Sequence, residues 1–232
     1  MSSLVLLHGL GATGRVWDAW PQPRVAPDLP GHGSADSLPR YTFESMTAAV
    51  AASLPVRRGL VVVGHSLGGV IALELASGRY GVQVDRVVAL GVKVTWSADD
   101  LGRAGALAQK PIAWFDTRDE AAARFLKVSG LQRLVDPASS AVDHGLAVVD
   151  GRWRLAMDPG TWAVGAPDLA MLLTASQADV VLARGELDPM NTDAELTALA
   201  PGGQVLTLTG LGHNAHVEDP SALDHVHGQA AS

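Results

Sequence analysis

The chain has 232 residues, a formal net charge of −7 and no cysteine. The acidic balance argues against nucleic acid and anionic membranes as partners, because both favour clustered Lys and Arg side chains. The lack of cysteine excludes disulfides and thiolate catalysis, and the length fits one domain with a large core.

The first expected element is a short buried strand over residues 4–7, which ends at His8-Gly9-Leu10-Gly11. Because Met1-Ser2-Ser3 carries no run of positive charge, we interpret the apolar residues after it as a core strand and not as a signal peptide. No segment approaches the ~18 apolar residues that span a membrane. We therefore expect a cytoplasmic protein without a membrane partner.

Residues 46–54 predict a helix, and the apolar run 59–63 predicts the next buried strand. That strand leads into Gly64-His65-Ser66-Leu67-Gly68, and the apolar residues 70–76 predict a helix directly after it. This is the G-x-S-x-G pattern in a strand–turn–helix context. It predicts a sharp turn that lifts the serine hydroxyl out of the backbone, where a base can activate it as a nucleophile.

The neighbours of Ser66 support the same interpretation. Gly64 and Gly68 remove the β-carbons that would clash in so tight a turn. The Leu67 amide would lie at a helix N-terminus, where it can donate a hydrogen bond to a developing oxyanion.

Further along the chain, residues 85–92 predict another strand, whereas residues 95–164 depart from the strand–helix rhythm. We expect two or three helices in that segment, for example over residues 118–127. Residues 168–173 then predict a helix that returns the chain to the sheet.

The last two expected strands each precede a residue that can act in catalysis. Residues 180–185 predict a strand that ends close to Asp188, and residues 205–208 predict a strand before Gly212-His213. In an open parallel sheet, ligands bind beyond the carboxyl ends of the strands. We therefore expect the side chains of Asp188, His213 and Ser66 to lie at that edge.

The loops after these strands carry short motifs in a fixed order, namely H-G at residues 8–9, D-x-x-G-H-G at 28–33, G-H-S-x-G-G at 64–69, G-x-x-D at 185–188 and G-H-x-x-x-x-E-x-P at 212–220. With these motifs the chain resembles the α/β-hydrolase superfamily, in the branch that has a serine nucleophile. The resemblance covers about residues 4–92 and 178–226.

The resemblance implies an α/β fold with a mostly parallel, doubly wound sheet and a small helical cap. The cap would comprise residues 95–164, and the core would comprise residues 1–94 and 165–232. Most relatives have a hairpin before the strand that ends in His-Gly, but this chain begins almost on that strand. We therefore expect about six strands in place of eight.

The resemblance also implies the catalytic roles, in the family's own chain order: Ser66 as nucleophile, Asp188 as acid and His213 as base. His213 would take the Ser66 proton, while Asp188 would fix the tautomer of the imidazole. The oxyanion hole would use the backbone amides of Leu10 and Leu67. This chemistry implies no metal and no cofactor.

Several roles have rivals nearby in the sequence. His216 competes with His213 as the base, although its position falls in the variable part of the motif. Glu186 competes as the acid, but at a strand end we expect it to bind backbone or cations. Some members place the acid after the preceding strand, which here would select Asp99 or Asp100.

Candidate substrate-binding residues are fewer. Trp17 follows the oxyanion loop, and Trp114 lies in the cap, so both are candidates for an apolar pocket, although tryptophans also simply pack such a lid. Lys93 interrupts the end of a strand near the expected site. It is a candidate for binding a substrate carboxylate or, as the favoured alternative, for an ion pair with Asp99 or Asp100.

The leading functional hypothesis is a serine hydrolase that cleaves a small carboxylic ester, thioester or related acyl compound. One alternative is a triad enzyme that does not hydrolyse, such as a lyase or a C–C bond-cleaving enzyme, because a fold does not fix a function. A second alternative is a non-catalytic small-molecule receptor, which tight binding without turnover would identify. Epoxide hydrolases and haloalkane dehalogenases carry Asp at the position of Ser66, which argues against both.

Overall fold

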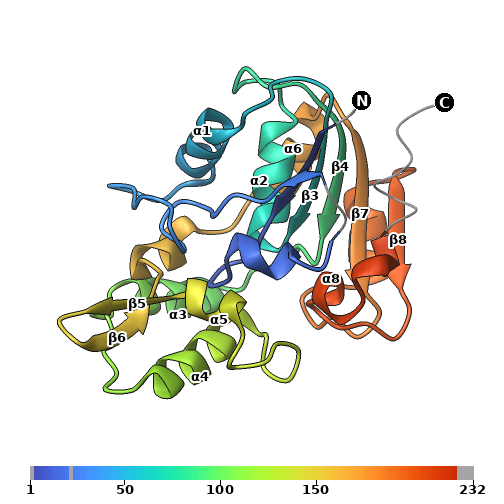
Figure 1. Cartoon of the computed structure of the whole chain (residues 1–232). Coiled ribbons are helices and arrows are strands. Elements are labelled where there is room, and N and C mark those ends of the chain that lie inside the picture. Colours follow the sequence, from blue (N-terminus) through green and yellow to red (C-terminus); the bar gives the residue numbers. More distant parts are fainter. Residues whose placement is uncertain (1–2, 21–22, 224–232) are drawn as a thin grey trace.

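The computed structural model describes residues 3–20 and 23–223. Its centre is a sheet with the strand order β2 (Arg24–Val25), β1 (Ser3–Leu7), β3 (Leu60–His65), β4 (Val84–Leu90), β7 (Asp179–Gly185) and β8 (Gln204–Leu208). All neighbouring strands in it are parallel. This confirms the predicted α/β class and six-stranded parallel sheet, shown in Figure 1.

Two hydrophobic cores lie on opposite faces of this sheet, because successive side chains of a strand point to opposite sides. Along β3, Leu60 and Val62 belong to one core and Val63 to the other. The first core is covered by α1 (Phe43–Ser53), α2 (Leu67–Leu75), α6 (Leu169–Ala175) and α7 (Asp193–Leu199). The second is covered by the short elements η1 (Gly14–Trp17), α8 (Ala215–Glu218) and η3 (Pro220–Leu223).

We call residues 95–164 the cap. It contains α3 (Ala98–Ala108), α4 (Arg118–Ser129), α5 (Ser140–His144), β5 (Leu146–Val149), β6 (Arg152–Leu155) and η2 (Pro159–Val164). A small core of its own includes Phe125, Leu126, Leu131 and Val142. In Figure 1 the cap lies toward the end of the sheet to which the strand arrows point.

One part of the cap differs from the sequence prediction of helices alone. β5 and β6 form an antiparallel hairpin, in which Val148 pairs with Trp153. Between the strands, Asp150 and Gly151 have positive φ angles of 51° and 76°. Two consecutive residues with positive φ form the tight turn whose twist matches that of a hairpin, and Asp-Gly is a preferred sequence for it.

The loops that follow β1 and β3 are held together by a backbone contact. A β-carbon added to Gly68, in the first turn of α2, would lie 2.3 Å from the Leu7 carbonyl oxygen and 2.7 Å from that of His8. No side chain fits there, because the neighbouring atoms belong to the backbone and cannot rotate away. The residue after the serine turn thus packs directly on the chain that enters the predicted oxyanion loop.

Gly68→Ala should therefore lower the free energy of unfolding by at least about 2 kcal/mol, on the scale of overpacking in a closed core. The matched control is Gly102→Ala in α3, where an added β-carbon meets nothing within 4 Å. That control should raise stability by roughly 0.5–1 kcal/mol, because alanine is the better helix residue. Urea unfolding of both variants measures the difference, and equal effects would contradict the close contact at Gly68.

Candidate active site

The turn at Ser66 is strained. β3 ends at His65, α2 begins at Leu67, and Ser66 between them has φ 52° and ψ −113°. Such a conformation costs a non-glycine residue about 1–3 kcal/mol and persists only where the surroundings impose it. Here the Ser66 amide donates to the Leu90 carbonyl at 2.8 Å, and a β-carbon on Gly64 would lie 2.2 Å from the Gly68 oxygen. The Ser66 side chain is left half-buried at the strand's carboxyl end.

A second pair of predicted residues meets at the same edge of the sheet. His213 Nδ1 donates to Asp188 Oδ2 at 3.0 Å, and the Asp188 side chain is fully enclosed whereas that of His213 is 24% exposed. This hydrogen bond leaves Nε2 of His213 as the nitrogen free to accept a proton. Gly91, directly after β4, packs closely against the pair, because a β-carbon there would lie 3.1 Å from the Asp188 carboxylate and 3.2 Å from His213 Nδ1.

The imidazole of His65 lies between those of His213 and His216 in a row of three ring contacts. The His65 ring lies 4.6 Å from the His213 ring and 4.3 Å from the His216 ring, measured between centroids. His65 Nε2 donates to the His213 carbonyl oxygen at 2.9 Å. Burial, with smaller contributions from the neighbouring histidines, lowers the pKa of His65 well below its usual value and that of His216 to about 3. Both rings are therefore neutral near pH 7.

His216, the rival base, is enclosed in the core. It is 1% exposed and its other face packs against Trp17, with ring centroids 4.3 Å apart. Since no substrate can reach an enclosed ring, this position favours a packing role over proton transfer.

The predicted oxyanion loop is tied to the D-x-x-G-H-G loop by two buried histidines. His8 Nε2 accepts from the Leu29 amide at 2.8 Å, and His32 Nε2 accepts from the Gly11 amide at 3.1 Å. Burial lowers the pKa of His8 to about 4 and that of His32 to about 3, so both rings stay neutral acceptors. These two rings therefore hold the two loops together.

The next feature is the pair of backbone amides predicted to bind an oxyanion. Among the residues that the structure describes, neither the Leu10 nor the Leu67 N–H donates to a protein acceptor. Leu67 is the first residue of α2, so its N–H also lies at the positive end of the helix dipole. Free backbone donors of this kind are what a developing negative charge requires.

Asp28, the first residue of the D-x-x-G-H-G motif, connects this region to the cap, a role that the sequence did not indicate. Its carboxylate accepts from the Gly14 amide, from the amide and hydroxyl of Ser34, and from His144 Nε2 in α5, each at 2.8 Å. Burial by itself would raise the pKa of Asp28, but the hydrogen bonds from Ser34, Gly14 and His144 lower it to about 2.

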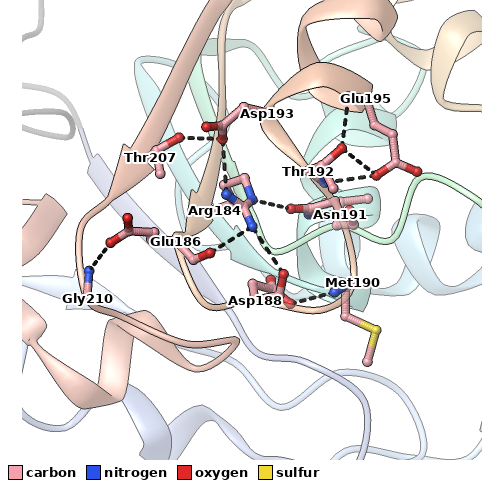
Figure 2. Close-up of polar contacts among 11 residues, drawn as sticks. Arg184, Glu186, Asp188, Met190, Asn191, Thr192, Asp193, Glu195, Thr207 and Gly210 are labelled. Carbon is pink, nitrogen blue, oxygen red and sulfur yellow. Dashed lines mark hydrogen bonds and ion pairs between the residues drawn. The ribbon is translucent and has the colours of Figure 1, made fainter.

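Arg184 organises the loop that carries Asp188, as Figure 2 shows. It lies near the end of β7 and is 7% exposed. Its guanidinium donates to the side chains of Asn191 and Asp193 and to the carbonyl oxygens of Glu186 and Asp188, over distances of 2.9–3.1 Å. Asn191 in turn donates to the Val92 carbonyl at 2.8 Å, which ties the loop to the end of β4. No motif in the sequence marked Arg184 for this role.

The rival acids have other partners. Glu186 accepts from the Gly210 amide at 2.8 Å, as expected for a backbone-binding residue. Asp100 caps α3 by accepting from the Ser97 amide at 3.1 Å, and it pairs with Lys93 at 2.9 Å. Asp99 is exposed in the first turn of the same helix.

The three predicted substrate-binding residues fall in different surroundings. Trp17 is 0% exposed and packs against Trp20 in the core under the sheet, so that prediction is wrong: an enclosed ring offers no surface to a substrate. Lys93 forms an ion pair with Asp100 and lies over the Trp96 ring. The ion pair is the alternative that the sequence favoured over binding of a substrate carboxylate. Trp114 is 38% exposed on the cap and stays a prediction.

No helix in the described ranges is long and apolar enough to cross a membrane. Within residues 3–20 and 23–223, no group of three or more His, Asp or Glu side chains is arranged to hold a metal ion.

Comparison with known proteins gives consistent matches. The model of the alpha/beta hydrolase family matches residues 4–225. The lipase LipV of Mycobacterium tuberculosis is 30% identical over 189 residues, which cover 77% of this chain and 68% of that protein. A pimeloyl-[acyl-carrier protein] methyl ester esterase of Aromatoleum aromaticum is 29% identical over 242 residues and 95% of each chain.

Solved structures share the fold along nearly the whole chain. An esterase of Mycobacterium tuberculosis superposes with a TM-score of 0.75 at 25% identity, covering 98% of this chain and 84% of that one. The thioesterase domain of the curacin biosynthetic pathway superposes with a TM-score of 0.77 at 21% identity, covering 98% and 91%. At 21% identity, the second likeness concerns the fold alone.

Arg184→Met should lower the free energy of unfolding by about 2–4 kcal/mol, because it strips a buried donor from several acceptors at once. Arg184→Lys should lower the free energy of unfolding by less, because lysine keeps the positive charge although it lacks the planar guanidinium. Arg58→Met, at an exposed arginine, is the matched control and should change stability by less than about 0.5 kcal/mol. Urea unfolding of the three variants tests this, and a Met variant as stable as the control would contradict the network.

Asp28→Asn should change how stability depends on pH. Because the folded pKa of Asp28 is lowered to about 2 from 3.8, its contribution is present above pH 3.8 and is lost as the pH falls through about 2. The variant should be about 1–2 kcal/mol less stable than the wild type at pH 6, and the gap should narrow between pH 4 and pH 2. Asp36→Asn, at an exposed carboxylate, serves as control. A gap that stays constant with pH would exclude this linkage.

Proposed function

Since the chain belongs to the alpha/beta hydrolase family and is an esterase-like enzyme, we propose that it cleaves small carboxylic esters through Ser66, His213 and Asp188. The observation that carries this proposal is the 3.0 Å hydrogen bond from His213 Nδ1 to Asp188, at the same sheet edge as a strained serine turn. A lipase and a methyl ester esterase among the relatives support ester cleavage as the reaction.

In the proposed first step, Ser66 Oγ attacks the ester carbonyl carbon while His213 Nε2 takes the hydroxyl proton. Asp188 keeps the imidazole in the tautomer that has the proton on Nδ1, and stabilises the imidazolium that forms. The bond between the carbonyl carbon and the alkoxy oxygen then breaks, and His213 returns the proton to the leaving alcohol. The product of this step is an acyl group on Ser66.

The second step regenerates the enzyme. His213 removes a proton from water, the hydroxide attacks the acyl carbon, and the bond to Ser66 Oγ breaks as the proton returns to that oxygen. In both steps the carbonyl oxygen becomes negatively charged. The amides of Leu10 and Leu67 would stabilise that oxyanion, and both lack a protein acceptor among the described residues.

Ser66→Ala should reduce kcat/KM on the best ester by roughly 10⁴ to 10⁶, the scale for loss of a triad nucleophile, and should abolish labelling by a fluorophosphonate. His213→Ala should lose a similar factor, because the two residues act as a unit. The measurement is a panel of p-nitrophenyl esters of varied acyl length, run beside the fluorophosphonate label.

His216→Ala, assayed at a temperature where it is folded, is the control and should lose less than about tenfold. The reverse order of the two histidine variants would assign the base to His216. Retention of a tenth of the activity by Ser66→Ala would exclude Ser66 as nucleophile. Ligand binding without labelling or turnover by the wild type would favour a receptor over an enzyme.

A further inference from the structure

The cap contains a small cavity of about 110 Å³ whose walls are mostly apolar. Ile112, Val128 and Trp162 contribute apolar surface, and Ile112 is itself 41% exposed. Among the described residues, the charged side chains in the lining are Lys110 and Arg124, and none is acidic. An apolar hollow with a few charged groups of one sign is typical of a ligand pocket.

Helix α4 connects a wall of this cavity to the loops of the proposed catalytic centre. Val128 lines it and also packs on the oxyanion loop, because a β-carbon on Gly11 would lie 2.6 Å from Val128 Cγ1. Two residues later, the Gly130 carbonyl accepts from Asn214, the neighbour of His213, at 3.1 Å. The last turn of α4 thus reaches from the oxyanion loop to the histidine loop. Arg124 lies one turn earlier on the same face as Val128, because their spacing is four residues.

Some cationic side chains of the cap have acidic partners and others do not. Arg103, Arg118 and Arg152 each pair with a carboxylate. Within the part of the chain that the structure describes, Lys110 and Arg124 have neither an ion pair nor a side-chain hydrogen bond. Two cations without a paired acid thus line one cavity in a chain of net charge −7. Their charge is available to a ligand.

We propose that this cavity binds a short apolar arm of the ester substrate and that Lys110 and Arg124 bind an anionic group, such as a carboxylate, carried by that arm. The proposal rests on the proposed function. Apolar walls suit the methylene groups of the arm, while the planar guanidinium of Arg124 matches the two oxygens of a carboxylate. The enzyme therefore prefers anionic esters to neutral esters of the same length.

The test compares pairs of esters that differ only in charge. In the first pair, monomethyl glutarate carries a carboxylate at the end of its acyl chain, where methyl valerate has a methyl group. In the second pair, 3-carboxypropyl butyrate carries a carboxylate at the end of its alcohol part, where butyl butyrate has a methyl group. The wild type should prefer the anionic member of one pair in kcat/KM, and the pair that shows the preference identifies the side that enters the cavity. At 0.5 M NaCl the Debye length falls to roughly 4 Å. Salt then screens exposed ion pairs, so the preference for the anionic ester should weaken.

The double variant Lys110→Met/Arg124→Met should lose roughly tenfold in kcat/KM on the anionic ester and less than twofold on its neutral partner, as expected for two ion pairs at exposed residues. Lys127→Gln removes a charge from the same helix outside the cavity and should leave the preference unchanged. Thermal unfolding confirms that all variants are folded.

The outcomes separate this proposal from the proposed function. If the wild type hydrolyses both members of each pair equally, or if the double variant loses activity equally on both, the cavity does not bind an anionic arm, although Ser66 catalysis stands. If Ser66→Ala retains the wild-type activity, the proposed function itself is wrong.

Discussion

Close backbone contact holds the site together. At the turn between β3 and α2, a β-carbon on Gly64 would overlap the Gly68 carbonyl, and one on Gly68 would overlap the carbonyls of Leu7 and His8. These contacts hold Ser66 in its strained conformation and set the Leu67 amide beside the loop of Leu10. The same holds at the other loop, where a β-carbon on Gly185 would lie 2.1 Å from the Gly212 oxygen. Backbone atoms, which have no rotamers to adjust, thus fix the positions of the loops that carry the catalytic side chains.

Neutral imidazole rings fill much of the space around this frame. His8 and His32 accept hydrogen bonds from loop amides, and His65 donates to the carbonyl of His213. Each ring satisfies a backbone group that would otherwise be buried without a partner. Because burial holds the pKa of these rings far below 7, they add hydrogen bonds near the catalytic pair without adding charge.

The sheet and the motif loops could be predicted from the sequence because the parallel strands, buried on both faces, appear as continuous apolar runs. The β5–β6 hairpin was predictable in principle, since Asp150-Gly151 between β-branched and aromatic residues is a hairpin signal, but the helical cap expected for the family obscured it. Trp17 was misassigned because proximity in sequence to the oxyanion loop does not say which face of the sheet a ring enters. The role of Arg184 depends on carbonyl oxygens that only the folded loop brings together, so no local sequence pattern predicts it.

The contact between His65 and His213 links two loops that are 148 residues apart in the chain. Ser66 follows His65 directly, so the hydrogen bond to the His213 carbonyl and the tilted contact of the two rings join the serine turn to the histidine loop. Because this contact resists separation of the two loops, a displacement of one loop should carry the other with it. The distance between the Ser66 hydroxyl and the His213 imidazole should then change less, when the strands of the sheet move, than the position of either group.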